Sequence, residues 1–321
     1  MIRNRFSVVI FSVLLPVVAL TADIYDFVPR QSDQVIQIDL TDIPGMESVK
    51  KDLTDTFSRQ TGIDGKSDKY VAISKDIAKI LIVTLNLTED ETFVIVGLRV
   101  PENDFCRDLE KLTGVQHAVV KRASRIERQF VLQKGNSILG IPFKKRTFVY
   151  SFPAVGVAVF AKNTLDRYFA GKPWGLPKAD RTPFQYPTAL VSGFTRMNPQ
   201  LLQDNPLLPP FYRTVYSLSA GQAGSIRFQG EFSCTDAESA EMVKQQLRQY
   251  VNIGGFLLNQ YDPELMREWM QQVKINSSST AVTVNGELSR AFLERLAAAS
   301  EQMSAAVRTG RKPPRNKSQG K

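Results

Sequence analysis

Apolar and polar residues alternate in many short runs along this chain, and the pattern predicts β-strands. Within residues 35–40, Ile36, Ile38 and Leu40 fall on one face, which is the period of two that a half-buried strand shows. Comparable runs rich in β-branched and aromatic residues are expected to form the other strands. These runs lie at 79–87, 92–100, 115–120, 128–133, 147–152, 155–160, 189–194, 213–220, 225–233 and 280–285.

Apolar residues at helical spacing predict helices between these strands. Two of them have clear ends, because Gly114 follows the helix expected over 103–112, and Asp262 with Pro263 begins the one that continues to 271. Glycine favours the position just after a helix, whereas proline favours its first turn. The other helices are expected at 45–57, at 163–169, in a short segment from 199, at 236–250 and at 288–305.

The second half of the chain repeats the order of elements of the first half. Three pairs of segments align in pattern, namely 36–41 with 190–195, 93–100 with 226–233, and 155–160 with 280–284. Self-similarity of this kind favours an internal duplication. We therefore predict an α+β fold with two similar lobes, each a mostly antiparallel sheet packed with helices.

Prolines mark the expected boundary between the two lobes. They stand at Pro173, Pro177, Pro183 and Pro187, and this density predicts a stiff connection without regular structure. The expected organisation is a signal peptide at 1–22, a first lobe at 23–172, a Pro-rich linker at 173–187, a second lobe at 188–307 and a disordered basic tail at 308–321.

The N-terminus has the three-part layout of a secretory signal. Arg3 and Arg5 precede an apolar run over 6–20, which ends in a small-residue segment just before Asp23. The run is about 15 residues long, short of the roughly 20 that span a bilayer, so cleavage and export to the periplasm or the extracellular space are expected. The alternative is an uncleaved segment that anchors the protein to a membrane. After cleavage no transmembrane span is expected.

Short motifs in the chain resemble a family of exported proteins. The residues that carry the resemblance are 27–29, the strand at 35–40, the run Phe-Ser-Cys-Thr-Asp-Ala-Glu-Ser-Ala at 232–240 and a helix near the C-terminus. Together with the signal, they resemble uncharacterised exported two-lobed proteins of planctomycete-type bacteria. The resemblance implies a two-lobed α+β body outside the cytoplasm, and it implies no activity.

The formal net charge of +9 is concentrated at the ends of the chain. Arg3 and Arg5 carry two of these charges, and the tail from residue 308 carries six without any acid, so the body between is nearly neutral. Nucleic-acid binding is therefore not expected. The tail could contact an anionic polymer or lipid surface, or it could serve only to keep the protein soluble. Its basic residues are Arg308, Arg311, Lys312, Arg315, Lys317 and Lys321.

Candidate chemistry is sparse. Cys106 and Cys234 could form one disulfide in an oxidising compartment, or they could remain two buried thiols. His117 is the single histidine, so the two-histidine zinc motif is excluded, and no metal or cofactor is expected. Acids cluster at 262–268 and at 236–238, both at expected helix starts, where acids favour the helix dipole.

These observations predict a non-enzymatic binding or scaffolding protein of the cell envelope. Its expected partner is an envelope protein or an anionic polymer or lipid surface. The alternative is a secreted or periplasmic hydrolase whose site is built from dispersed carboxylates. A pocket that joins two or more acids would favour this hydrolase.

Overall fold

The computed structural model describes the following residues: 23–40, 75–87, 91–122, 125–132, 137–138, 141–142, 146–170, 173–185, 188–198, 202–203, 210–260, 262–296 and 298. The predicted signal peptide, the helix predicted over 45–57 and the basic tail lie outside the described residues.

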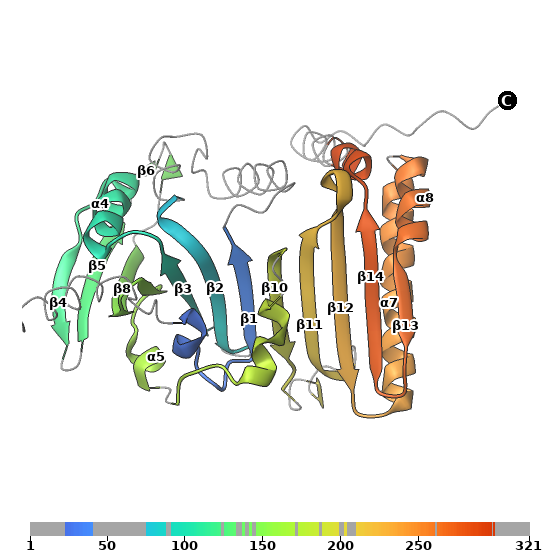
Figure 1. Ribbon diagram of the computed structural model, residues 1–321, viewed down its shortest axis with the longest axis horizontal. Helices are drawn as coiled ribbons and strands as arrows, with labels where there is room; N and C mark the ends of the chain where they lie inside the picture. Colours follow the sequence, from blue (N-terminus) through green and yellow to red (C-terminus); the bar gives the residue numbers. More distant parts are fainter. Residues whose placement is uncertain are drawn as a thin grey trace, which may run out of the picture.

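One antiparallel sheet of twelve strands forms the body of the molecule (Figure 1). In spatial order its strands are β13 (Lys274–Ser277), β14 (Ala281–Leu288), β12 (Ile226–Cys234), β11 (Phe211–Ala220), β10 (Ala189–Arg196), β1 (Gln34–Asp39), β2 (Ile77–Asn86), β3 (Glu91–Leu98), β9 (Val157–Ala161), β8 (Arg146–Ala154), β5 (Arg125–Leu132) and β4 (Ala118–Arg122). A separate two-stranded sheet joins β6 (Ser137–Ile138) to β7 (Ile141–Pro142).

The α+β class predicted from the sequence is confirmed. The described helices include α4 (Glu102–Thr113), α5 (Asp166–Ala170), α7 (Ala237–Asn259) and α8 (Pro263–Gln272), with 3-10 helices η1 (Ile24–Phe27), η2 (Lys178–Phe184) and η3 (Gln222–Gly224). Two predicted helix ends are confirmed. Gly114 ends α4 with a left-handed φ of 70°. At the start of α8, the Asp262 carboxylate accepts a hydrogen bond from the Glu264 amide at 2.8 Å. Strand β14 runs on to Leu288, so the last helix begins at Arg290 rather than at 288.

The two halves of the chain meet at the centre of the sheet, where β1 pairs with β10. In the first half, β1, β2 and β3 form a meander, and β9 returns to pair with β3. In the second half, β10, β11 and β12 form a meander, and β14 returns to pair with β12. The sheet is therefore continuous from one half to the other.

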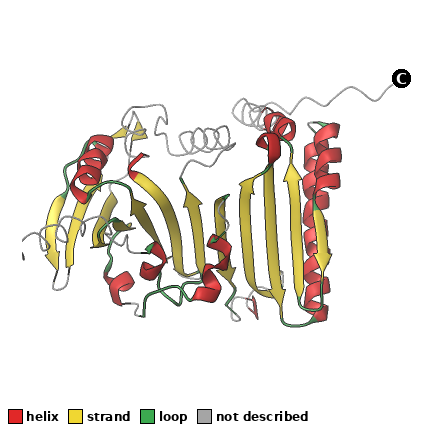
Figure 2. Cartoon of the chain, viewed as in Figure 1, coloured by secondary structure: helices red, strands yellow, loops and turns green. Residues whose placement is uncertain are grey.

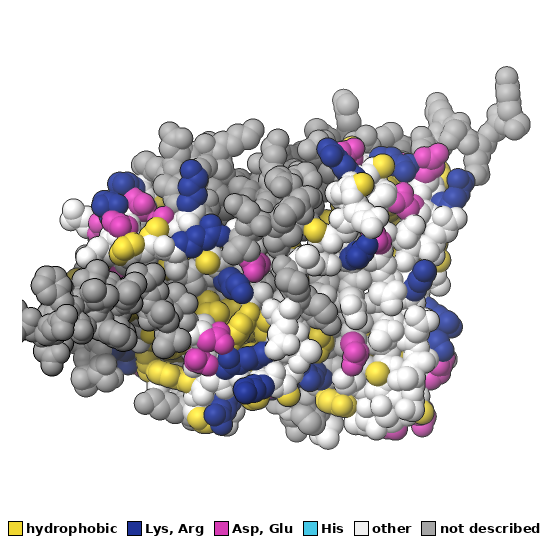
Figure 3. Space-filling model, viewed as in Figure 1, with side chains coloured by type: hydrophobic (Ala, Val, Ile, Leu, Met, Phe, Trp, Pro, Cys, Tyr) yellow, Lys and Arg dark blue, Asp and Glu magenta, His cyan; other side chains and the backbone are white. Residues whose placement is uncertain are grey.

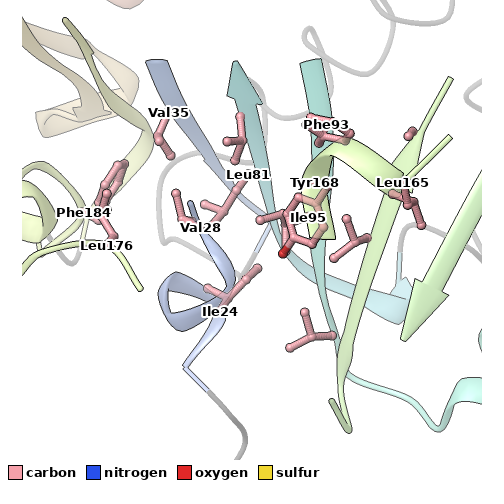
Figure 4. Packing of buried hydrophobic residues seen from close by; sticks show 14 of the residues in the cluster. Ile24, Val28, Val35, Leu81, Phe93, Ile95, Leu165, Tyr168, Leu176 and Phe184 are labelled. Atoms are coloured by element: carbon pink, nitrogen blue, oxygen red, sulfur yellow. The ribbon is translucent and has the colours of Figure 1, made fainter. Parts of the chain in front are cut away.

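We call the face of the sheet that carries η1, η2 and α5 the front face. In the first half, an apolar core fills this face (Figure 4). Leu81, Ile95 and Phe93 of the strands are buried there against Val28 beside η1 and Tyr168 of α5. Figure 2 shows η1 and η2 in front of the central strands, whereas α7 and α8 lie behind the strands of the second half.

Helices α4 and α7 both pack on the back face. Successive side chains of a strand point to opposite faces, so Val96, next to front-facing Ile95, points back and packs against Phe105 of α4. Likewise Phe232 and Val282 point back and pack with Val243 of α7. Each half therefore has a helix-covered back face.

The proline-rich stretch departs from the connection without regular structure that the sequence predicts. Lys178–Phe184 forms η2, and Leu176 and Phe184 are buried in the core of the first half. The Phe184 ring stacks on Tyr25 at 5.2 Å between centroids. Apolar residues between the prolines dock this stretch onto the sheet, and the backbone takes the tight 3-10 form there.

Candidate functional site

Beyond Phe194 and Val215, which pack in the core of the first half, the front face of the second half is mostly polar, whereas that of the first half is apolar. Its side chains come from β11, β12, β14 and β13, and we call them the polar face. They are Ser217, Ser219, Arg227, Gln229, Glu231, Lys274, Asn276, Thr283, Asn285 and Glu287. Figure 3 shows this region as mostly white, with few apolar side chains.

The side chains of the polar face line up in rows across the strands. In one row, Ser217, Gln229, Asn285 and Lys274 are consecutive partners in the strand register. Neighbouring strands are about 4.8 Å apart, so this row extends roughly 14 Å. Gln229 and Lys274 are exposed, and Ser217 and Asn285 are half-buried. The row can thus hydrogen-bond to a ligand of several polar groups.

A hollow of about 500 Å³ lies over this part of the sheet. Its polar lining includes Thr188, Ser217, Ser219, Arg227, Gln229, Lys274, Asn285 and Glu287. Hydroxyl and amide groups both donate and accept hydrogen bonds. Several of the side chains that line the hollow can therefore both donate and accept hydrogen bonds, and Phe228 adds an apolar part to the lining.

One ion pair is fixed at the edge of the hollow. The Arg227 Nε donates to Glu287 Oε2 at 2.9 Å, and the Ser225 hydroxyl donates to Glu287 Oε1. These two contacts, the serine first, lower the pKa of the Glu287 carboxyl. A Cβ at Gly221 would lie 2.5 Å from Glu287 Oε1, so only glycine leaves room for the carboxylate in this place.

The charges of the polar face balance. Arg227 and Lys274 supply two positive charges, and Glu231 and Glu287 supply two negative ones. The face thus carries no formal net charge.

The polar row continues into the buried centre of the sheet, on β10 and β1. Ser217 pairs with Ser192, and Ser192 pairs with Gln37, and both of these residues are buried. The Tyr25 hydroxyl donates to Gln37 Oε1, whereas the buried Ser192 Oγ has no hydrogen-bond partner among the described residues. The polar character thus extends beyond the open surface into the sheet centre.

The two cysteines lie in different cores, and both are free thiols. Cys106 on α4 packs with Phe130 and Tyr150 of the first half. Cys234 at the end of β12 packs with Val282 and the start of α7. The disulfide considered from the sequence is therefore not formed, because each thiol belongs to the back-face core of its own half.

The other residues singled out in the sequence have structural partners. His117 lies just before β4, and its Nδ1 is 2.5 Å from Glu110 Oε1. Asp262, Glu264 and Glu268 lie around Arg295, at 3.7, 2.5 and 3.5 Å from its guanidinium nitrogens. Among the described residues, no group of three or more His, Cys, Asp and Glu could hold a metal ion.

Two carboxylates of the polar face are too far apart for paired acid catalysis. Glu231 and Glu287 are four residues and one strand apart in register, a separation of roughly 14 Å. Glycosidases hold their two carboxyl groups about 5 to 9.5 Å apart. This pair therefore does not form such a site.

Searches for known relatives returned nothing: no family model, curated protein or solved structure matches the chain. Within the described part of the chain, no helix combines the length and the apolar character needed to cross a bilayer. The cations predicted to contact an anionic surface, from Arg308 to Lys321, lie outside the described residues.

Proposed function

We propose that this protein is an exported, non-enzymatic binding protein of the cell envelope, and that its polar face binds a neutral carbohydrate chain. The observation that carries the proposal is the polar hollow on an otherwise standard sheet. A sheet face normally packs in a core or faces water, and this one arranges hydroxyls and amides in rows beside a fixed Arg227–Glu287 pair.

The ligand class follows from the donors and acceptors on the face. Sugar hydroxyls donate and accept, as do Ser217, Gln229 and Asn285. The balanced charge favours a neutral polymer over an anionic one. A row roughly 14 Å long extends over more than one sugar ring, so a chain fits the face better than a monosaccharide.

Export rests on the predicted signal peptide at 1–22 and on the resemblance to exported planctomycete-type proteins. An envelope location would bring the polar face to the polysaccharides found outside the cytoplasm. The basic tail, Arg308–Lys321, would add a separate attraction to anionic surfaces.

We also propose that the two lobes arose by duplication of one unit. The segments that align in sequence fall on strands in matching places, β1 with β10, β3 with β12 and β9 with β14. Under this proposal one copy has kept a covered front face, and the other copy presents its front face to a ligand.

Binding to a panel of immobilised neutral and acidic oligosaccharides tests the proposed function. We expect the purified protein to bind neutral chains, and the double variant Gln229→Ala with Asn285→Ala to bind at least about tenfold more weakly, since two good hydrogen bonds are lost. The matched control removes one amide of each kind elsewhere, Asn163→Ala with Gln271→Ala, both exposed and off the polar face.

Three outcomes would contradict the proposal. Absence of binding to any neutral chain would remove the ligand class. Binding that the polar-face variant leaves unchanged would place the site elsewhere. Release of new reducing ends from a bound glycan would replace the binding protein by the alternative hydrolase.

A further inference from the structure

Strand β13 is the outermost strand on the side of the second half, and no described strand pairs with its outer edge (Figure 1). In the turn that leads to β14, the Ser278 amide donates to the Ala281 carbonyl at 2.8 Å. Backbone groups of successive residues in an antiparallel strand point to opposite sides. Those of Asn276 therefore also point to β14, whereas those of Ile275 and Ser277 point away from it. The outer edge thus offers backbone donors and acceptors to one more strand.

A small pocket lies beside this edge, and we call it the edge pocket. Its volume is about 330 Å³. It opens toward the back face, because α7 lines it and because Ile275 also packs in the back-face core with Val243. Four of its lining side chains are apolar, so it can take an apolar side chain of a ligand. The lining residues are Arg248, Val251, Asn252, Met270, Val273 and Ile275.

Arg248 carries the single charge among the described residues that line the edge pocket. One turn earlier on α7, Lys244 is paired with Glu241 at 3.0 Å. Within the described part of the chain, Arg248 has neither an ion pair nor a hydrogen-bond partner. A guanidinium can bind a carboxylate through two parallel hydrogen bonds. The edge pocket therefore has a place for a carboxylate next to a place for an apolar side chain.

The edge pocket lies at the end of the edge where β13 begins. Met270 near the end of α8 and Val273 just before β13 both line it. The two strand pairs nearest this edge are antiparallel, and a strand that adds to β13 in the same way has its C-terminus at this end. Its terminal carboxylate then lies beside Arg248.

We propose that the outer edge of β13 and the edge pocket bind the C-terminus of another protein as an extended, antiparallel strand. The terminal carboxylate pairs with Arg248, and the apolar last side chain enters the edge pocket. In such strand addition, main-chain hydrogen bonds supply affinity and a side-chain pocket supplies specificity. This site lies apart from the polar face, so it does not rest on the proposed carbohydrate binding.

Charge selects another protein's C-terminus over a second copy and over the tail of this chain. The β13 strand and the edge pocket of a second copy contain no acidic side chain, so pairing two edges would leave both Arg248 side chains without a carboxylate. The tail at 308–321 has six cations and no acidic side chain, and its charge is repelled by Arg248. The occupant must instead bring its own carboxylate.

An array of hexapeptides immobilised through their N-termini tests the role of the carboxylate. Each peptide has mixed residues at its first five positions, ends in valine, leucine, isoleucine or phenylalanine, and is present as the free acid and as the C-terminal amide. We expect the purified protein to bind free acids, and to bind the amides at least about tenfold more weakly, since the charged hydrogen bonds are lost.

Substitution of the pocket arginine completes this test. Arg248→Gln should lower the binding of the free acids to the level of the amides. Arg267→Gln is the matched control, since Arg267 is an exposed cation of α8 that does not line the edge pocket, and it should leave binding unchanged. If no peptide bound, if acids and amides bound alike, or if both variants bound like the wild type, the proposal would be overturned.

Ser277→Pro tests the addition of a strand. It removes an amide that points away from β14, so the pairing of β13 with β14 is kept, and we expect the free acids to bind at least about tenfold more weakly. Ser277→Ala keeps this amide and should bind like the wild type. Thermal unfolding of both variants checks that they fold alike. Unchanged binding by Ser277→Pro would mean that the ligand does not pair with the edge, and would overturn the proposed arrangement.

Discussion

One row of side chains crosses the whole front face and changes character at the sheet centre. From the second half to the first, its members are Lys274, Asn285, Gln229, Ser217, Ser192, Gln37, Leu81, Ile95 and Val159. The polar members belong to the second half and the centre, and the apolar members to the first half. The same strand pairing thus supports a core on one side and an open polar face on the other.

The two front faces differ in what covers them. In the first half, η1, η2 and α5 bury the row, and Leu81 and Ile95 have no solvent exposure. In the second half the back-face core with α7 supplies most of the packing, and the side chains of the polar face are exposed or half-buried. A sheet covered on one side only is an ordinary stable arrangement, so the second half needs no front core to fold.

The largest expected effect on stability comes from truncating a buried apolar side chain of this row. Leu81→Ala should lower the free energy of unfolding by about 3 kcal/mol, because it removes a fully buried side chain and leaves a cavity. Asn285→Ala, in the same row, should change it by no more than about 0.5 kcal/mol, as for a surface substitution. Urea denaturation followed by circular dichroism measures both. Similar losses in the two variants would mean that the polar face is structural.

Sequence patterns predicted the strands well because alternation reports burial locally. The strands β2 and β3, the helix ends at Gly114 and Asp262, and the class of the fold all follow from short windows. The edge strand β13 was missed, because Lys274–Ser277 is short and three of its four side chains are exposed, so no apolar period marks it.

The sequence pattern did not predict the polar face, for a different reason. Residues 225–233 alternate strictly, and the alternation predicts a strand, but it does not say whether the polar side meets water, a ligand or another core. That depends on which strands become neighbours. Ser217 and Asn285 are far apart in the chain and share a row only because β12 lies between β11 and β14.

A smaller effect is expected in the rates at which the two cysteines are alkylated, because these rates report the local stability of each half. We expect Cys234 to be alkylated roughly tenfold faster than Cys106 in low urea, since its half lacks a front core and should open at a free energy about 1.4 kcal/mol lower. Burial raises the pKa of both thiols, so neither should react quickly in the native protein. Pulsed alkylation with mass spectrometry follows both sites. Faster labelling of Cys106 would reverse the assignment of the weaker half.

The smallest effect concerns the ion pair at the edge of the polar hollow. Because folding lowers the pKa of Glu287 from its ordinary value of 4.5, the carboxylate stabilises the folded state above pH 4.5, and this contribution is lost as the pH falls through the lowered pKa. The Glu287 side chain is 37% exposed, so Glu287→Gln should cost less than about 1 kcal/mol at neutral pH, and the difference from wild type should shrink in acid.

A substitution at Ser225 tests the cause of the lowered Glu287 pKa directly. Since the Ser225 hydroxyl is the largest cause of the lowered pKa, Ser225→Ala should move the Glu287 titration, followed by carboxyl NMR, back toward its ordinary range. Ser217→Ala removes a hydroxyl one row away and should leave the titration unchanged. If both variants left the Glu287 titration unchanged, the carboxylate would not be held at the edge of the hollow, and the polar face would carry a mobile charge instead of a fixed ion pair.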